Sequence, residues 1–246
     1  MRVVGLWRYP VKSMQGENVD AVRLEARGVA GDRRFGVLDV ASGTVVSAKR
    51  DGSVLEGHAR SAAGAVLVEV PGAGELLPGG TLDAALTRWL GREVRLVEAD
   101  DGRAARFESQ SDAERDDSES ECWQGVPGSF VDSSPVHVVG LDELASVEAE
   151  CPELSWDVRR FRPNVLVERA VALTPGSPLR MGAGVVEVVK PCARCVMTTR
   201  AQPGGIAREL GVLRHLASAR GNELGVLVRV IRPGEVRIGD SVGRLS

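Results

Sequence analysis

Cys192 and Cys195 stand in a C-x-x-C spacing within the stretch VVEVVKPCARCVMTTR, which covers residues 185–200. Thiolates ligate metals and act as nucleophiles. In a chain without a dense cysteine framework, this spacing is more typical of metal binding or catalysis than of a structural disulfide. Four interpretations are open: a redox dithiol, part of a zinc site, a single thiolate ligand to another metal, or two buried core residues.

The zinc and dithiol interpretations have the least support from the surrounding sequence. A structural zinc site usually takes four Cys or His ligands in two close pairs. The other possible ligands are dispersed along the chain: Cys122, Cys151, His58, His137 and His215. A thioredoxin-like dithiol opens a helix, whereas the apolar and β-branched stretch VMTT follows Cys195.

Arg194, between the two cysteines, bears on the remaining interpretations. Free cysteines are often simply buried in a core. A guanidinium beside a buried thiol needs an anionic partner, because an unpaired buried charge is costly. A thiolate, a metal-bound oxyanion or a phosphate would serve. The residues favour a thiolate ligand to a soft metal, but they do not name the metal.

The charge balance and the absence of long apolar runs limit the partners. The chain has 246 residues, a net charge of −3 and a pI near 5.8, which gives no general reason to bind nucleic acid or an anionic membrane. Arg8 and Lys12 interrupt the first apolar run, and no stretch approaches the roughly 18 apolar residues of a membrane span. We therefore expect a cytoplasmic protein that binds neither nucleic acid nor membranes.

Short valine-rich runs separated by glycine and proline predict a mostly β fold with two or three helices. Helices are expected over 81–91, from about Leu141 and over 205–220. In the first, Thr81 would cap the N-terminus or Asp83 would stabilise the first turn; in the second, Asp142 would be the cap. A strand at Val185–Val189 would hold the cysteine loop, and Pro191 would set its turn.

The segment 106–121 divides the chain. It contains seven acids and four serines and almost no apolar side chain, which is typical of an exposed, mobile loop. We expect an N-terminal domain over 1–98, a linker over 99–121 and a second domain over 122–246.

Four stretches together are more specific than the cysteine pair: RYPVKSMQG, GDRRFGVLD, RFRPNVLV and KPCARCVMTT. In that order the chain resembles the MOSC proteins with an N-terminal MOSC β-barrel domain, a family that includes the mitochondrial amidoxime-reducing component and its bacterial relatives. Its C-terminal part also resembles molybdenum cofactor sulfurases. The resemblance implies a β-barrel MOSC domain, a smaller β-rich N-terminal domain and a molybdenum cofactor, a phosphate-bearing pterin dithiolene, at their interface.

The resemblance also implies roles for individual residues. Cys195 would coordinate molybdenum, with Cys192 as its neighbour. The residues Ala193, Arg194, Lys12 and Arg33 would contact the cofactor, and Asp132 would lie near the metal as a candidate catalytic residue. From its type alone, Asp132 could equally cap a turn. The relatives often have a cysteine where this chain has Met14, a position we do not expect to be a ligand.

Further polar residues could hold the cofactor's anionic groups. Arg162 and Asn164 flank Pro163 and offer a fork of donors beside an amide, a combination suited to a phosphate or pterin. Ser133 and Ser134 offer hydroxyl and backbone N–H groups before a strand, a plausible anion nest.

The leading expectation is an oxidoreductase that removes oxygen from a small N-hydroxylated or N-oxygenated substrate. We expect no iron–sulfur segment or membrane anchor, so electrons would come from a separate ferredoxin, flavoprotein or cytochrome b5-like protein. One alternative is a sulfur carrier that uses a Cys195 persulfide. It would receive sulfur in trans, because no pyridoxal-phosphate lyase domain is recognisable. The other alternative is a module that stores the cofactor without turnover.

Overall fold

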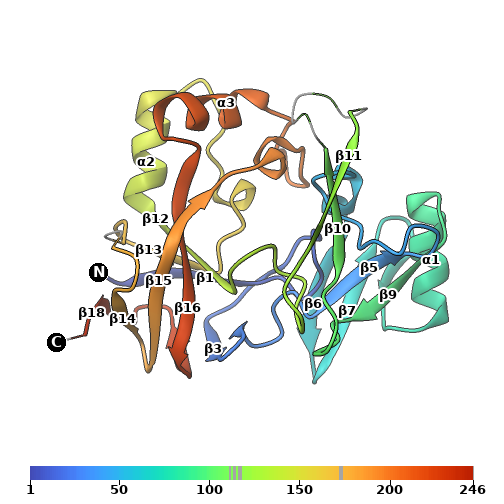
Figure 1. The fold of residues 1–246 in the computed structure, drawn as a ribbon, viewed down its shortest axis with the longest axis horizontal. Helices are drawn as coiled ribbons and strands as arrows, with labels where there is room; N and C mark the ends of the chain where they lie inside the picture. Colours follow the sequence, from blue (N-terminus) through green and yellow to red (C-terminus); the bar gives the residue numbers. More distant parts are fainter. Residues whose placement is uncertain (111, 113–114, 116–117, 172–173, 246) are drawn as a thin grey trace.

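The computed structural model describes residues 1–110, 112, 115, 118–171 and 174–245. Figure 1 shows two lobes side by side. The smaller lobe contains the strands and the helix between residues 35 and 124, and the larger lobe contains the strands before and after that range. The mostly β prediction is confirmed. No helix in the described ranges has the length and apolar character to cross a membrane.

The larger lobe is built on an eight-stranded sheet. Its neighbouring strands are antiparallel except for one parallel pair, β12 and β13. The strands in spatial order are β18 (Val242–Arg244), β14 (Pro178–Met181), β15 (Gly184–Ala193), β16 (Glu223–Arg232), β12 (Val136–Gly140), β13 (Val165–Val167), β1 (Val3–Arg8) and β2 (Glu17–Asn18). A three-stranded sheet of β17 (Gly234–Arg237), β3 (Ala21–Glu25) and β4 (Gly28–Val29) packs onto its core.

The first strands of the chain belong to the larger lobe, not to the smaller one. β1 pairs with β13, and β3 pairs with β17. Their buried side chains share one apolar cluster with the late strands, and this cluster includes Val3, Leu6, Leu24, Val138 and Val228. The predicted sequence units 1–98 and 122–246 therefore differ from the two lobes in space.

The smaller lobe packs helix α1 (Gly80–Leu90) against short sheets. These are β5 (Phe35–Asp39) with β9 (Val94–Glu98), and β6 (His58–Ala62) with β7 (Ala65–Val70) and β8 (Gly74–Leu76); a 3₁₀ turn, η1 (Gly52–Glu56), precedes β6. The helix prediction is confirmed, and Asp83 lies in the first turn. The N-cap is Gly79, not Thr81. Gly91 ends the helix in the left-handed region, with φ of 67°.

The other two helices cover one end of the eight-stranded sheet (Figure 1). Helix α2 (Leu141–Glu150) has Gly140 as its N-cap, and the side chain of Glu143 accepts from the Gly140 amide. Asp142 is therefore not the cap; its carboxylate accepts from the amide of Ala170 instead. Helix α3 (Leu210–Ala219) begins later than predicted: residues 205–209, which were expected to be part of it, are not helical.

The acidic segment is structured at both ends, so the loop prediction is wrong there. Strands β10 (Arg106–Gln110) and β11 (Ser120–Gln124) form an antiparallel hairpin. Phe107 is fully buried with Val45 and Phe130, and this cluster anchors the hairpin to the smaller lobe. The part of the predicted loop at residues 111, 113–114 and 116–117 lies outside the described residues.

Strand β15 continues past the predicted end at Val189 and includes Pro191. Pro191 does not end the strand, because β14 pairs only with residues 184–187 of β15. Beyond that point β15 continues to pair with β16, with register irregularities around Lys190 and Ala193. A proline is tolerated where a strand has a free edge or a bulge.

Candidate functional site

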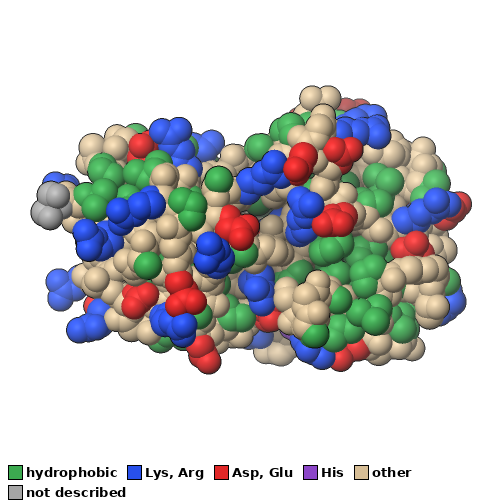
Figure 2. Space-filling model, turned by 90° about the horizontal axis from the view of Figure 1, so that it is seen from below, with side chains coloured by type: hydrophobic (Ala, Val, Ile, Leu, Met, Phe, Trp, Pro, Cys, Tyr) green, Lys and Arg blue, Asp and Glu red, His purple; other side chains and the backbone are tan. Residues whose placement is uncertain are grey.

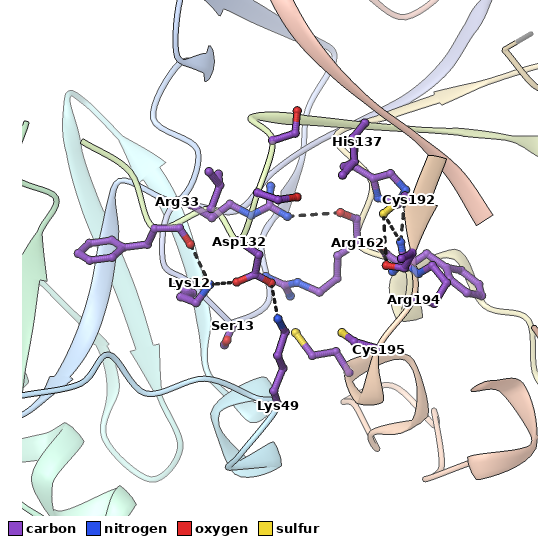
Figure 3. A pocket seen from close by; sticks show the side chains of 18 of the residues that line it. Lys12, Ser13, Arg33, Lys49, Asp132, His137, Arg162, Cys192, Arg194 and Cys195 are labelled. Carbon is purple, nitrogen blue, oxygen red and sulfur yellow. Dashed lines mark hydrogen bonds and ion pairs between the residues drawn. The ribbon is translucent and has the colours of Figure 1, made fainter. Parts of the chain in front are cut away.

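A cavity of about 360 Å³ lies between the two lobes. The larger lobe contributes the segment Arg160–Asn164 and the cysteine segment Cys192–Cys195 to its wall. The remaining wall includes Lys12 and Arg33, near the start of the chain, and Lys49 from the smaller lobe. Figure 3 shows these side chains converging on one space. The volume is within the usual range for small-molecule and cofactor sites.

Arg162 presents unmatched donors to this cavity. It follows the 3₁₀ turn η2 (Val158–Arg160) and precedes Pro163, with a left-handed backbone, φ 51°. It is 7% exposed, and both Nη1 and Nη2 lack a hydrogen-bond partner among the described residues. Burial, helped by the charge of Arg33, lowers the pKa of Arg162 to about 10, so the guanidinium stays charged at neutral pH.

Tyr9 is the platform on which the two arginines lie. The guanidinium carbons of Arg33 and Arg162 are 4.4 and 4.2 Å from its ring centroid. Arg33 is also ion-paired with Asp32 and donates to the carbonyl oxygen of Arg162 at 3.4 Å. Burial raises the pKa of Tyr9 to about 12, although both arginines oppose that shift. A neutral ring thus supports two cations at this end of the cavity.

Asp132 joins two lysines in the middle of the cavity. Its Oδ1 accepts from Nζ of Lys12 at 2.6 Å, and its Oδ2 lies 3.0 Å from Nζ of Lys49. Lys12 also donates to the carbonyl oxygen of Phe130 at 2.9 Å. Burial would raise the pKa of Asp132, but the two lysines hold that pKa well below its ordinary value. The carboxylate is therefore ionised and acts as an acceptor.

The two lysines differ in their protonation equilibria. Burial lowers the pKa of Lys12, and Asp132 opposes this shift without cancelling it. Burial also acts on Lys49, but the negative charge of Asp132 and its hydrogen bond help to outweigh it and raise the pKa of Lys49. The cavity therefore stabilises the protonated form of Lys49 more than it stabilises that of Lys12.

Two aromatic rings of the β10–β11 hairpin pack against the same lysines. Nζ of Lys12 lies 3.9 Å from the ring centroid of Phe107, and Nζ of Lys49 lies 4.1 Å from that of Trp123. The rings contact each other with centroids 5.4 Å apart. Trp123 also lines the cavity, so the segment predicted to be a loop supplies one aromatic wall of the site.

Cys195 lies at the start of the 3₁₀ turn η3 (Val196–Thr199), partly exposed and lining the cavity. Its carbonyl oxygen accepts from the amide and the hydroxyl of Thr198 at 3.0 and 2.9 Å. The fully buried Arg160 donates to the carbonyl oxygens of Thr198 and Arg200 at 3.2 and 3.4 Å. These bonds fix the turn and leave the thiol directed toward the cavity (Figure 3).

The guanidinium of Arg194 is directed toward Cys192. Its Nη1 donates to Sγ of Cys192 at 2.9 Å and lies 3.4 Å from Nε2 of His137. Its Nε is buried without a partner among the described residues. Burial, with the charge of Arg194, lowers the pKa of His137 to about 3, so the ring is neutral. Cys192 is thus held in place by Arg194 beside Cys195.

Asn164 lines the cavity, but its amide links strands of the larger lobe. Its Oδ1 accepts from the amide of His137 at 3.2 Å, and its Nδ2 donates to the carbonyl oxygen of Trp7 at 3.4 Å. The predicted clamp of Arg162 and Asn164 is therefore unequal: Arg162 has free donors, and Asn164 supports the wall.

The other predicted residues also line the cavity. Ser134 donates its hydroxyl to the carbonyl oxygen of Val228 at 3.2 Å, whereas Ser133 and Ala193 are exposed. Met14 is a fully buried core residue of the smaller lobe, which agrees with its not being a ligand.

Lys49 and Trp123 were not identified from the sequence, and neither was Ser13. Lys49 stands in the turn SAKRDG and looks like an ordinary surface cation. Ser13 has φ of 67°, and its hydroxyl accepts from the amide of Ala48 at 3.0 Å, which ties the two cavity-lining turns together. The one local signal was the clustering of Lys49 with Arg50 and Asp51 in a turn.

The donor set of the cavity fits an anion with a soft metal. Among the described residues, six cationic side chains and one carboxylate, that of Asp132, line the cavity; the cations are Lys12, Arg33, Lys49, Arg160, Arg162 and Arg194. Buried donors are almost always paired, so the free donors of Arg162 and Arg194 indicate a ligand with acceptor oxygens. Figure 2 shows both charge signs interspersed on one outer face, in contrast to the cavity.

Protein side chains alone do not make a metal site here. Within the described ranges, no group of three or more His, Cys, Asp or Glu side chains is placed to hold a metal ion. A metal beside Cys195 would therefore take its remaining ligands from a cofactor. A phosphate-bearing dithiolene pterin satisfies both needs, because its phosphate suits the arginines and its sulfur ligands complete a soft-metal site.

Comparisons with known proteins cover both lobes. The model of the MOSC domain matches residues 127–243, and that of the MOSC N-terminal beta barrel domain matches residues 1–105. Mitochondrial amidoxime reducing component 2 from Bos taurus is 24% identical over 276 residues, which span 96% of this chain and 81% of the relative.

Two solved structures are also similar to the chain. The YuaD protein from Bacillus subtilis aligns with 98% of this chain and 93% of its own, at 12% identity and a TM-score of 0.45. YiiM from Geobacillus stearothermophilus aligns with 51% of this chain and 67% of its own, at 14% identity and a TM-score of 0.37.

Proposed function

This chain belongs to the MOSC proteins that carry an N-terminal MOSC β-barrel domain, and we propose that it is a molybdenum-cofactor oxidoreductase acting on N-hydroxylated or N-oxygenated compounds. One observation carries the proposal: the free guanidinium donors of Arg162 and the thiol of Cys195 line the same cavity. The similarity to an amidoxime reducing component supports the substrate class.

The roles of the residues follow from their chemistry. Arg162 and Arg33, on Tyr9, would hold the cofactor's phosphate by charge-assisted hydrogen bonds. Cys195 would be the protein ligand to molybdenum, on a turn that backbone hydrogen bonds keep rigid. The free Nε of Arg194 would donate to an acceptor of the cofactor.

The bound cofactor would supply the two-electron chemistry that breaks the substrate N–O bond, with the oxygen leaving as water after uptake of two protons. The electrons would come from a separate donor protein of the ferredoxin, flavoprotein or cytochrome b5-like class. The protein's own contribution is electrostatic. Lys12 and Lys49 offset negative charge in the cavity, and ionised Asp132 holds both ammonium groups in place.

This proposal is tested by measuring molybdenum and pterin content and by comparing the activities of two variants, Cys195→Ser and Cys192→Ser. Protein from cells that overproduce the cofactor is expected to contain molybdenum and a fluorescent oxidised pterin, and to reduce benzamidoxime with an artificial electron donor. Cys195→Ser is expected to lose nearly all activity. Cys192→Ser, the matched control, is expected to keep most of it. Absence of both metal and pterin, or normal activity in Cys195→Ser, would refute the proposal.

A sulfur carrier is the second candidate, favoured by the partial exposure of Cys195 at a cationic cavity. The Cys195 thiolate would take a sulfane sulfur from the persulfide of a separate desulfurase, which is left as a thiol. A peptide containing Cys195 that gains the mass of one sulfur atom, in protein without molybdenum, would favour this candidate. Bound pterin with no activity toward any N-oxygenated compound would instead indicate storage.

A further inference from the structure

The ammonium group of Lys49 lies in a setting that proteins use to bind organic cations. It is 4.1 Å from the ring centroid of Trp123 and 3.0 Å from Oδ2 of Asp132. The Lys49 side chain is 14% exposed and the Asp132 side chain is 39% exposed, so the ammonium group is largely shielded from water on the cavity side of the carboxylate. An aromatic face combined with a carboxylate is a strong site for a cation out of bulk water.

The two walls of this setting are held by contacts that do not involve Lys49. Asp132 is fixed through Oδ1 by Lys12 at 2.6 Å. Trp123 is held on strand β11 and packs on Phe107, with ring centroids 5.4 Å apart. The ring centroid of Phe107 in turn lies 3.9 Å from Nζ of Lys12. Removal of the Lys49 side chain would therefore leave the ring and the carboxylate in place.

Lys49 reaches this position from a turn that is itself fixed. Arg200 donates to the carbonyl oxygens of Ala48 and Lys49 at 3.2 and 3.0 Å. The ammonium group is thus covalently tethered and held close to its two partners. A cation from solution would have to displace the ammonium group of Lys49, whose effective concentration at this position is high because it is part of the same chain.

We propose that Trp123 and Asp132 form a binding site for organic cations and that Lys49 fills it as a tethered, intramolecular cation. The arrangement excludes cationic ligands from this part of the cavity by occupying their position and repelling their charge. A neutral ligand is not repelled by the charge of Lys49 and does not need the position between Trp123 and Asp132. The device is a repulsive element of specificity, not an additional attractive contact.

The consequence for turnover rests on the proposed function. An amidoxime is uncharged near neutral pH, whereas the amidine formed from it is protonated. Lys49 would therefore weaken the binding of the product relative to the substrate and favour its release. The cation site itself does not depend on that function.

Calorimetric titration of the purified full-length protein tests the site with two matched probes. Benzamidinium is planar and cationic, and benzamide is a neutral compound of nearly the same shape. Wild-type protein is expected to bind benzamidinium weakly. Lys49→Ala is expected to bind benzamidinium at least about tenfold more tightly, the scale of a cation–π contact with a charge pair, while benzamide affinity stays unchanged. Lys49→Gln, a second neutral variant, guards against misfolding of the first.

Two further variants assign the effect to the named groups. Lys49→Arg keeps the tethered charge and is expected to exclude benzamidinium as the wild type does. Adding Trp123→Leu to Lys49→Ala is expected to abolish the gain. Unchanged benzamidinium affinity in folded Lys49→Ala and Lys49→Gln would overturn the proposal, and so would an equal gain for benzamide. If protein from cells that overproduce the cofactor lacks both molybdenum and pterin but still shows the gain, the oxidoreductase proposal is refuted and the cation site is sustained.

Discussion

Arg162 combines features that each cost stability in a protein without a ligand. It is nearly buried, both terminal nitrogens lack a partner among the described residues, and its backbone is left-handed. Ser13 and Arg33 line the same cavity and also have positive φ. Such conformations cost about 1–3 kcal/mol each and persist where a site requires them. The costs concentrate at the cavity because a bound anion would offset them.

Arg162→Met is expected to separate stability from ligand binding. Loss of the unmatched charge would raise the free energy of unfolding of the cofactor-free protein by about 1–3 kcal/mol, while cofactor content falls to background. Urea unfolding and pterin analysis measure the two effects. Arg23→Met, at a 70% exposed side chain, is the control and is expected to change neither. A less stable Arg162→Met protein would contradict the assignment.

His137 predicts a pH dependence of stability with a definite sign. Burial holds its pKa at about 3 in the folded protein, below the ordinary value of 6.5. As pH falls below 6.5 the unfolded chain gains this proton first, so the contribution is complete above that pH and is lost toward pH 3. Between pH 7.5 and 5.0 the wild type is expected to lose about 2 kcal/mol more than His137→Gln in urea unfolding. Equal losses would show that His137 is protonated in the folded state.

At the scale of elements, the side chain of Arg200 ties the turn that carries Cys195 to the smaller lobe. Arg200 follows η3 and is buried. Its guanidinium donates to the carbonyl oxygens of Ala48 and Lys49, and to Oε1 of Gln110 at 2.8 Å. Arg200 thus connects the segment that follows Cys195 to the turn that carries Lys49.

Arg200→Leu is expected to lower the free energy of unfolding by about 2–4 kcal/mol, because the acceptors of the smaller lobe, Ala48, Lys49 and Gln110, lose their donor. Arg200→Lys would recover part of this, since lysine supplies the charge but not the planar fork. Thermal unfolding of both variants, with exposed Arg95→Leu as the control, measures the difference. Identical effects of the leucine and lysine substitutions would argue against the geometry described here.

The residues to which the family resemblance assigned a role come together in the structure: Lys12, Arg33, Asp132, Arg162 and Cys195 line one cavity. Their roles toward a ligand stay predictions, and the elements around them could be predicted only in part. The continuation of β15 through Pro191 was not predictable from the sequence. A strand accepts a proline only where no neighbour needs its N–H group, and this depends on how far β14 extends alongside β15. The β10–β11 hairpin was hidden by its charged composition, since burial of Phe107 is a tertiary effect.

The residues missed in the site share one property: their roles come only from long-range contacts. The role of Lys49 depends on its contacts with Asp132 and Trp123, and both residues are more than seventy positions away in the chain. Local propensity and spacing carry no information about such pairs. The pairing of Arg194 with Cys192 was missed for a related reason, because the direction of a side chain depends on the path of the bulged strand.

At the scale of the whole molecule, the larger lobe has a composite core. Strands β1, β3 and β4 bury Val3, Leu6, Val22, Leu24 and Val29 against the late strands. The match of the MOSC domain to residues 127–243 therefore does not define a unit with a complete core.

A fragment of residues 122–246 is expected to lack a cooperative unfolding transition, because these early apolar side chains are missing from its core. Circular dichroism against urea concentration measures this, with the full chain as the reference. Adding the fragment 1–121 is expected to restore the transition. Cooperative unfolding of 122–246 alone would show that the early strands are dispensable.

The pairing of β1 with β13 and of β3 with β17 has a consequence for the timing of biosynthesis. A ribosome completes β1 and β3 long before it reaches their partners, whereas the strands of the smaller lobe follow one another between residues 35 and 124. The smaller lobe can fold on the nascent chain, but the larger lobe closes only after its late strands β13 and β17 have been made. The cavity takes walls from both lobes, so a ligand that contacts both walls can bind only after these strands have folded.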